Sequence, residues 1–101
     1  MAEERSVQER LEHLLGDLEL AIMQIVWTRD EVTVRQVWAA LQPQRALAYT
    51  TVMTVMSRLA QKGVLVVRKQ GKTYYYRAAA TADEFVSLRA QIPNGWRRSK
   101  S

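Results

Sequence analysis

Residues 48–63 of this chain read AYTTVMTVMSRLAQKG, and the fold can be worked out from this stretch. At 100° per residue the stretch forms a helix with one apolar face. That face consists of Val52, Val55, Met56 and Leu59. Gly63 after Lys62 is typical of a helix C-terminus, whereas no standard capping side chain marks the first residue. The apolar face must therefore pack on other helices, which leaves the opposite face exposed.

The opposite face of this helix is rich in hydroxyl and amide groups. It carries Thr50, Thr54, Ser57 and Gln61, with Thr51 and Arg58 on one flank and Met53 on the other. Such groups suit base edges and phosphates in a DNA groove. A solvated helix face of this kind is also ordinary, and a lone methionine such as Met53 more often borders a core than reads a base. The face alone therefore does not establish DNA binding.

The charge distribution around this helix is one-sided. No acidic residue lies between Glu31 and Asp83. The same segment holds eight basic residues: Arg35, Arg45, Arg58, Lys62, Arg68, Lys69, Lys72 and Arg77. Residues 1–31 have eight acidic and three basic residues, whereas residues 32–101 have two acidic and twelve basic ones. We therefore expect a polyanionic partner, with the first third of the chain facing away from it.

Two further helices are predicted before residue 48. Apolar residues at helical spacing predict a helix from about Leu18 to Trp27, with Asp17 as its candidate N-cap. Thr33 and Gln36 form a capping box that opens the next helix, which Pro43 closes. Residues 1–15 are a polar lead-in with some helical periodicity. Trp27 and Trp38 end apolar stripes and are expected in the core.

After Gly63 the pattern changes to that of a β-hairpin. Residues 64–69 and 73–77 are strand-like, and Gln70-Gly71-Lys72 forms the turn between them. At least one of the tyrosines 74–76, Tyr75 or a neighbour, should pack beneath the hairpin. Basic residues beside tyrosines would also suit single-strand stacking, but no larger sheet is present to support it. Thr81 or Asp83 then caps a last helix through Ala90, followed by a basic tail.

The order of these elements predicts a mainly α fold with a small β-hairpin: a winged helix-turn-helix with a three-helix core plus wing. The expected organisation is a lead-in at 1–15, a DNA-binding domain at 16–80, and a short helix with a basic tail at 81–101. We call residues 68–77 the wing.

In this class the N-terminal turns of the second helix of the motif reach base edges. Thr50 and Thr54 are thus the leading candidates for base or phosphate contacts. Thr51 is placed for a phosphate, Met53 for a thymine methyl, and Arg58 and Lys62 for phosphates. Lys72 would grip the backbone or enter the minor groove, unless it is merely solvated. The full set of candidate DNA-contacting residues is Tyr49, Thr50, Thr51, Met53, Thr54, Ser57, Arg58, Lys62 and Lys72.

The composition argues against several other functions. There is no cysteine, and the single histidine, His13, has no second ligand nearby, so no metal or cofactor is expected. A Gly-rich phosphate loop and a catalytic cluster are also missing, so we do not expect an enzyme. No apolar run is long enough to span a bilayer, and the N-terminus does not resemble a signal peptide. A cytoplasmic protein is expected.

Several motifs resemble the penicillinase repressor family, of the BlaI, MecI and CopY type. The similarity covers residues 15 to about 80, and its strongest part is the helix at 48–55. Other matching motifs are LGDLE at 15–19, IVW at 25–27, TVRQV at 33–37, Arg58-Leu59, Lys62-Gly63 and the Arg77 strand. The resemblance implies a winged-helix repressor that binds a palindromic operator as a homodimer and controls β-lactamase or related genes. It also implies release when a membrane sensor protease triggers cleavage of the repressor.

Family members normally dimerise through a C-terminal helical region, whereas only residues 81–101 follow the wing here. Both a homodimer and a heterodimer with a family member therefore stay open. The copper-responsive branch has a cysteine-rich C-terminus, so copper sensing is not expected. A second hypothesis is a partner-binding winged-helix module that modulates a full-length family repressor.

Overall fold

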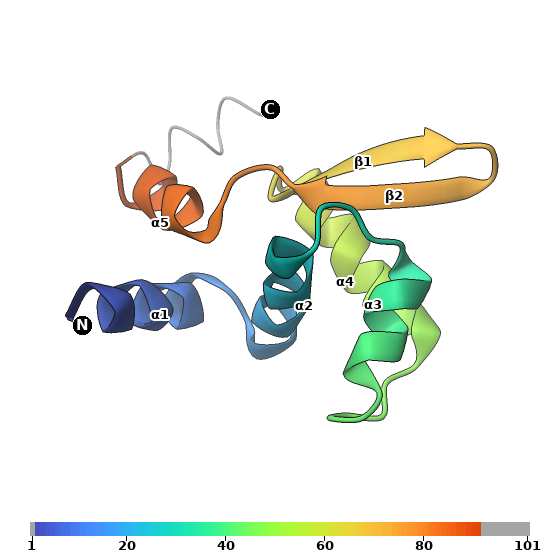
Figure 1. Ribbon diagram of the computed structural model, residues 1–101, viewed down its shortest axis with the longest axis horizontal. Coiled ribbons are helices and arrows are strands. Elements are labelled where there is room, and N and C mark those ends of the chain that lie inside the picture. Colours follow the sequence, from blue (N-terminus) through green and yellow to red (C-terminus); the bar gives the residue numbers. More distant parts are fainter. Residues whose placement is uncertain (1, 92–101) are drawn as a thin grey trace.

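The computed structural model describes the backbone of residues 2–91 and the side chains of residues 8–87. Within this part of the chain there are five helices and one antiparallel two-stranded sheet (Figure 1). The elements are α1 (Ala2–Leu14), α2 (Asp17–Thr28), α3 (Val34–Leu41), α4 (Tyr49–Gln61), β1 (Leu65–Gln70), β2 (Thr73–Ala78) and α5 (Ala82–Gln91). The predicted basic tail lies outside the described residues. The order and types of the elements confirm the predicted winged-helix fold.

The starts of α2, α3 and α5 follow local side-chain chemistry. Thr33 accepts from the Gln36 amide at 3.1 Å and Gln36 accepts from the Thr33 amide at 3.0 Å, which confirms the capping box of α3. Thr81 makes the same reciprocal bonds with Glu84 before α5, so Thr81 rather than Asp83 is the cap. The prediction of Asp17 as a cap was wrong. Asp17 is the first residue of α2, the N-cap is Gly16, and its amide donates to Glu19 at 3.0 Å.

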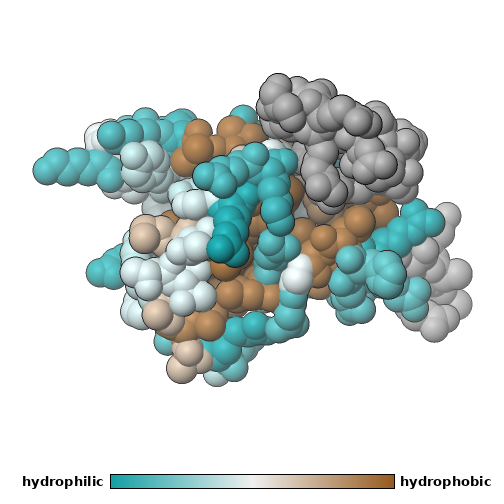
Figure 2. Space-filling model, turned by 180° about the vertical axis from the view of Figure 1, so that it is seen from behind, coloured by the Kyte–Doolittle hydropathy of each residue, from teal (hydrophilic) through white to brown (hydrophobic). Residues whose placement is uncertain are grey.

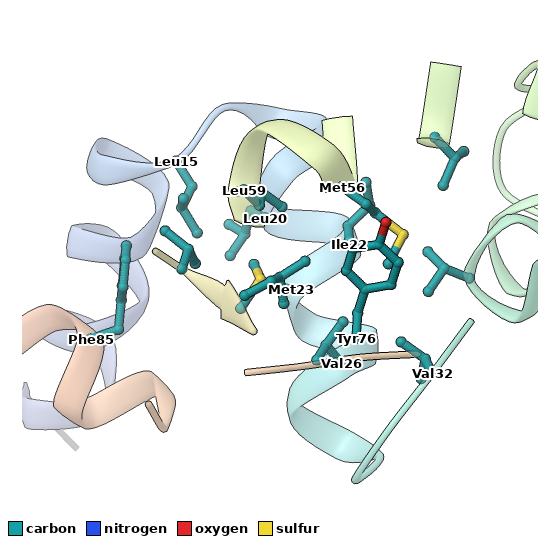
Figure 3. Close-up of a cluster of buried hydrophobic side chains, with 14 of the residues drawn as sticks. Leu15, Leu20, Ile22, Met23, Val26, Val32, Met56, Leu59, Tyr76 and Phe85 are labelled. Atoms are coloured by element: carbon teal, nitrogen blue, oxygen red, sulfur yellow. The ribbon is translucent and has the colours of Figure 1, made fainter. Parts of the chain in front are cut away.

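A single apolar cluster joins every helix to the base of the hairpin. Ile22 and Met23 of α2, Val37 of α3, and Met56 and Leu59 of α4 are fully buried in it. Figure 3 shows these helices meeting around the ring of Tyr76, which projects into the cluster from β2. The buried face of α4 is the one that its periodicity predicts, although Val55 is only partly buried.

The buried apolar anchors of the hairpin are confined to its base. Leu65 and Tyr76 are buried, whereas every residue from Val66 to Tyr74 is exposed. Val32, in the link between α2 and α3, exchanges backbone hydrogen bonds of 2.9 and 2.7 Å with Tyr76. The link thus lies against the outer edge of β2 like a short third strand. Tyr76 is therefore the tyrosine that packs beneath the hairpin.

The lead-in and the last helix lie together at the end of the molecule away from the hairpin (Figure 1). Leu11 and Leu15 are buried in the same cluster as Phe85 and Val86. Trp27 is partly buried, contacts Phe85 and donates to the Ala80 carbonyl at 2.9 Å, which fixes the start of this end region. Seen from behind, hydrophobic residues form a band across the middle of the molecule (Figure 2).

Candidate nucleic-acid interface

The position of α4 is fixed from two sides. On its inner face Val52, Met56 and Leu59 are fully buried against the other helices. At its start, Trp38 of α3 donates its indole N–H to the Leu47 carbonyl at 2.8 Å. The same indole packs edge-on against Tyr49, with ring centroids 5.9 Å apart. The partly buried Trp38 therefore holds the first turn of α4 against α3.

The first turn of α4 is open at its N-terminus. Ala48 occupies the N-cap position, and no side chain caps the helix there. The first amides of a helix lack intrahelical acceptors, and the helix dipole makes this end attractive to anions. The start of α4 is thus able to receive a phosphate oxygen next to the exposed hydroxyls of Thr50 and Thr51.

An open groove of about 700 Å³ separates α4 from the hairpin. We call it the α4–hairpin groove. Met53 and Ser57 of α4 line one side, and Val67 and Tyr74 of the hairpin line the other. The rest of its lining is Thr33, Val34, Arg35, Tyr49, Ala60, Lys72, Thr73 and Tyr76. No acidic residue is among them, and both charged residues are cations, so the groove suits an anionic partner.

The nine predicted contact residues lie on one surface, but only some of them line the groove. Thr50, Thr51, Thr54 and Arg58 are exposed on α4, outside the groove lining. Tyr49 and Met53, each 41% exposed, point into the groove together with the half-buried Ser57. Lys72 joins the groove from the turn of the hairpin, where Gly71 has a positive φ of 64°. Lys62 is exposed at the end of α4.

Three of the eight cations in the acid-free segment are paired with acids from the first third of the chain. Arg45 lies 3.0 Å from Asp17, Lys62 lies 3.3 Å from Glu19, and Arg68 lies 2.9 Å from Glu31. The separation of charge along the sequence is therefore incomplete in space. The other five form no ion pair within the described part of the chain: Arg35, Arg58, Lys69, Lys72 and Arg77.

The two faces of the hairpin carry different side chains because side chains alternate along each strand. Lys69 lies over the ring of its cross-strand partner Tyr74, at 5.6 Å from the centroid, on the groove side. On the other face Arg68 lies over Tyr75 at 4.7 Å and binds Glu31. The hydrogen bond from Arg68 holds the pKa of the Glu31 carboxyl below its ordinary value, with the Arg68 and Arg77 charges acting in the same direction.

Eight of the twelve residues that line the groove were not among the contacts predicted from the sequence, and two of them matter most for binding. Arg35 lines it from the first turn of α3, and Tyr74 lines it from β2. Arg35 could have been found, because it falls on the polar face of the capping-box helix. The selection of Tyr74 over Tyr75 could not, because strand alternation alone does not tell which face of a hairpin meets a helix.

Other kinds of site have no support in the described residues. Among them, no cluster of histidine, aspartate and glutamate could hold a metal ion. None of the helices described here is long and apolar enough to cross a bilayer.

Comparisons with known proteins agree with this geometry. The family model described as penicillinase repressor matches residues 15–92. A transcriptional regulator BlaI from Mycobacterium tuberculosis is 47% identical over 74 residues, which cover 72% of this chain and 54% of that protein. A penicillinase repressor from Bacillus licheniformis is 22% identical over 76 residues, covering 75% and 59%. The chain thus spans about half the length of the curated relatives it matches.

A solved structure shows the same fold. The solution structure of the DNA-binding domain of the repressor BlaI superposes with a TM-score of 0.62 at 26% identity. The match covers 68% of this chain and 85% of that domain.

Proposed function

This chain belongs to the penicillinase repressor family and has its winged-helix fold, and on this basis we propose that it is a transcriptional repressor that binds double-stranded DNA. The observation that carries the proposal is the α4–hairpin groove together with the adjacent outer face of α4. This surface brings hydroxyls and unpaired cations together without an acidic residue. Phosphate contacts from cations supply affinity, and hydroxyl contacts to base edges supply discrimination.

We assign different roles to the two sides of this surface. The outer face of α4 enters the major groove, where Thr50 and Thr54 contact base edges. Thr51 and Arg58, on the flank of α4, contact phosphates. Their exposure and the uncapped start of α4 support this assignment.

The groove receives the sugar-phosphate backbone next to the contacted bases. Arg35 and Lys72 lie at it as cations, and Met53 offers an apolar contact for a thymine methyl or a deoxyribose. Tyr49 and Ser57 complete the side formed by α4. Lys62 contributes less charge than its exposure suggests, because Glu19 lies 3.3 Å away.

The type of operator and the regulated genes are inferred from the family resemblance. We propose a palindromic operator bound by two chains, upstream of a β-lactamase gene or a related gene. The two chains would be copies of this protein or this protein and a full-length family member. A two-fold operator mirrors the symmetry of the two bound winged helices.

A second candidate function is a module that binds and modulates a full-length family repressor. The exposed apolar side chains favour it: Tyr49, Met53, Val67 and Tyr74 are 41–50% exposed and gather at one groove. Such a patch would also suit a protein partner. The cations at the same groove and the absence of acids favour DNA.

A titration of the chain into a family-type palindromic duplex and a scrambled duplex, at two salt concentrations, tests the proposal. We expect tighter binding to the palindrome, weakening at high salt, and two chains per duplex in sedimentation. Weak binding that ignores sequence and disappears with salt would contradict the repressor function. A chain that forms a complex with a family repressor and shifts neither duplex would favour the partner module.

A further inference from the structure

Glu31 and Arg68 form a bidentate ion pair that connects the loop between α2 and α3 to β1, the far strand of the hairpin. Arg68 Nε donates to Glu31 Oε2 at 2.9 Å and Arg68 Nη2 donates to Glu31 Oε1 at 2.9 Å. The third nitrogen, Nη1, donates to Gln70 Oε1 at 2.6 Å. A carboxylate held by two parallel bonds from a guanidinium has a fixed direction as well as a fixed distance.

This ion pair spans both strands of the hairpin. Val32 pairs with Tyr76 of β2, and β2 pairs with β1, so Glu31 lies at one edge and Arg68 on the far strand. Tyr75, the direct cross-strand partner of Arg68, lies between them with the guanidinium 4.7 Å from its ring centroid. Glu31, Tyr75 and Arg68 therefore form a row across the face of the hairpin that is turned away from the groove.

Little else holds this part of the hairpin in place. From Val66 to Tyr74 its residues are exposed, and the buried anchors Leu65 and Tyr76 lie at the base. A two-stranded ribbon with an exposed outer half twists and bends easily. The direction of the hairpin relative to α4 decides the width of the groove between them. A contact that fixes this direction therefore acts on the interface without touching DNA.

We propose that Glu31 is a positioning residue for the wing: by holding Arg68 on the outer face of the hairpin, it sets the direction of the hairpin relative to α4 and thus the preference for the operator. This proposal rests on the proposed function. It also explains why an acid is present directly before the acid-free segment, where its charge alone would oppose binding to a polyanion. The side chains of Arg68 and Glu31 keep 48% and 31% of their exposure, so the pair adds little to the stability of the fold.

The proposal and simple electrostatics predict different outcomes: charge alone changes the affinity for all DNA in opposite directions in the two variants, whereas loss of positioning lowers the preference for the operator in both. Glu31→Gln removes one negative charge, so charge alone predicts tighter binding to all DNA. Arg68→Gln removes one positive charge, so charge alone predicts weaker binding. If positioning dominates, both variants lower the ratio of operator to scrambled affinity by about two- to tenfold, the lower part of the range for coupled neighbours. Asp30→Asn is the matched control, because Asp30 is exposed and forms no ion pair among the described residues.

The experiment measures the operator-to-scrambled affinity ratio for the unchanged chain and these three variants. It also measures residual dipolar couplings of the hairpin amides relative to α4 in the free chains, and their melting temperatures. We expect lower ratios and altered hairpin couplings for Glu31→Gln and Arg68→Gln, with Asp30→Asn unchanged in both. Melting temperatures should stay nearly constant.

Opposite changes of affinity in Glu31→Gln and Arg68→Gln, with an unchanged ratio, would overturn the proposal. If the unchanged chain binds neither duplex, the proposed repressor function is wrong. The residual dipolar couplings of the hairpin amides then test by themselves whether Glu31 sets the direction of the hairpin. Hairpin couplings that are identical in the unchanged chain and Glu31→Gln would overturn it.

Discussion

The groove has two walls, and they are held in place by different forces. Helix α4 is fixed by apolar burial, since Val52, Met56 and Leu59 are fully enclosed. Beyond its base the hairpin is fixed by exposed polar contacts, chiefly Arg68 with Glu31. Burial of apolar surface is strong and insensitive to direction, whereas a bidentate ion pair is weak in water and directional. Changes behind α4 should thus alter stability, and changes around the hairpin should alter binding.

The largest effect is expected behind α4. Met56→Ala removes a fully buried side chain and should lower the free energy of unfolding by about 2–5 kcal/mol, measured by urea denaturation. Met53→Ala is the matched control, because Met53 lies on the same helix and is 41% exposed. Its effect should stay within about 0.5 kcal/mol. Equal losses for the two variants would contradict the division between a structural and a binding face of α4.

The next effect concerns discrimination on the exposed face of the same helix. Thr54→Ala or Thr50→Ala should reduce the preference for the operator over scrambled DNA by about 1–3 kcal/mol each, because base contacts carry discrimination. Both residues are exposed, so urea denaturation should show little change. Equal weakening on the operator and the scrambled duplex, in paired titrations, would show that these residues do not read bases.

The comparison of the two walls also explains how much the sequence predicts. The features of α4 and its neighbours are local: the capping box of Thr33 and Gln36, the end of α4 before Gly63, and the apolar stripe of α4 appear as predicted. Each depends on residues within a few positions of one another. The error at Asp17 is also local, because Glu19 can satisfy the Gly16 amide and the helix then starts one residue earlier than a cap at Asp17 would allow.

The arrangement of the hairpin depends on contacts that local patterns do not contain. Glu31 meets Arg68 across 37 residues, and Glu19 meets Lys62 across 43. A charge count along the sequence therefore overestimates the cations free to bind DNA. The burial of Tyr76 follows from its pairing with Val32, since alternation alone allows either face of the strand to be inward. The roles assigned to the nine candidate residues stay predictions.

A smaller effect is expected on the salt dependence of DNA binding, where paired and unpaired cations should differ. Arg58→Ala and Lys72→Ala should each reduce the slope of log affinity against log salt by about one unit, because each loses one phosphate contact. Lys62→Ala should change the slope by less, since Glu19 already neutralises Lys62. Titrations at several salt concentrations measure these slopes. A slope change for Lys62→Ala as large as that for Arg58→Ala would contradict the neutralisation, and no change for Lys72→Ala would remove the wing from the interface.

The smallest effect is expected on lowering the pH, which should weaken the contact that holds the hairpin and not the packing that holds α4. The hydrogen bond from Arg68 lowers the pKa of Glu31 below its ordinary value of 4.5. A lowered pKa means that the pair stabilises the folded chain fully above pH 4.5 and loses this contribution as pH falls through the lowered value. Arg68 stays protonated throughout, so the carboxyl alone titrates.

Carbon NMR of the Glu31 carboxyl measures this titration. We expect a midpoint below 4.5 in the unchanged chain and a rise toward 4.5 in Arg68→Gln. A midpoint at or above 4.5 in the unchanged chain would show that Arg68 does not hold the carboxylate in solution. Because the apolar packing behind α4 contains no carboxylate or histidine, acid should alter the amide couplings of the hairpin before those of α4. Simultaneous changes in both elements would mean that the walls of the groove are not held independently.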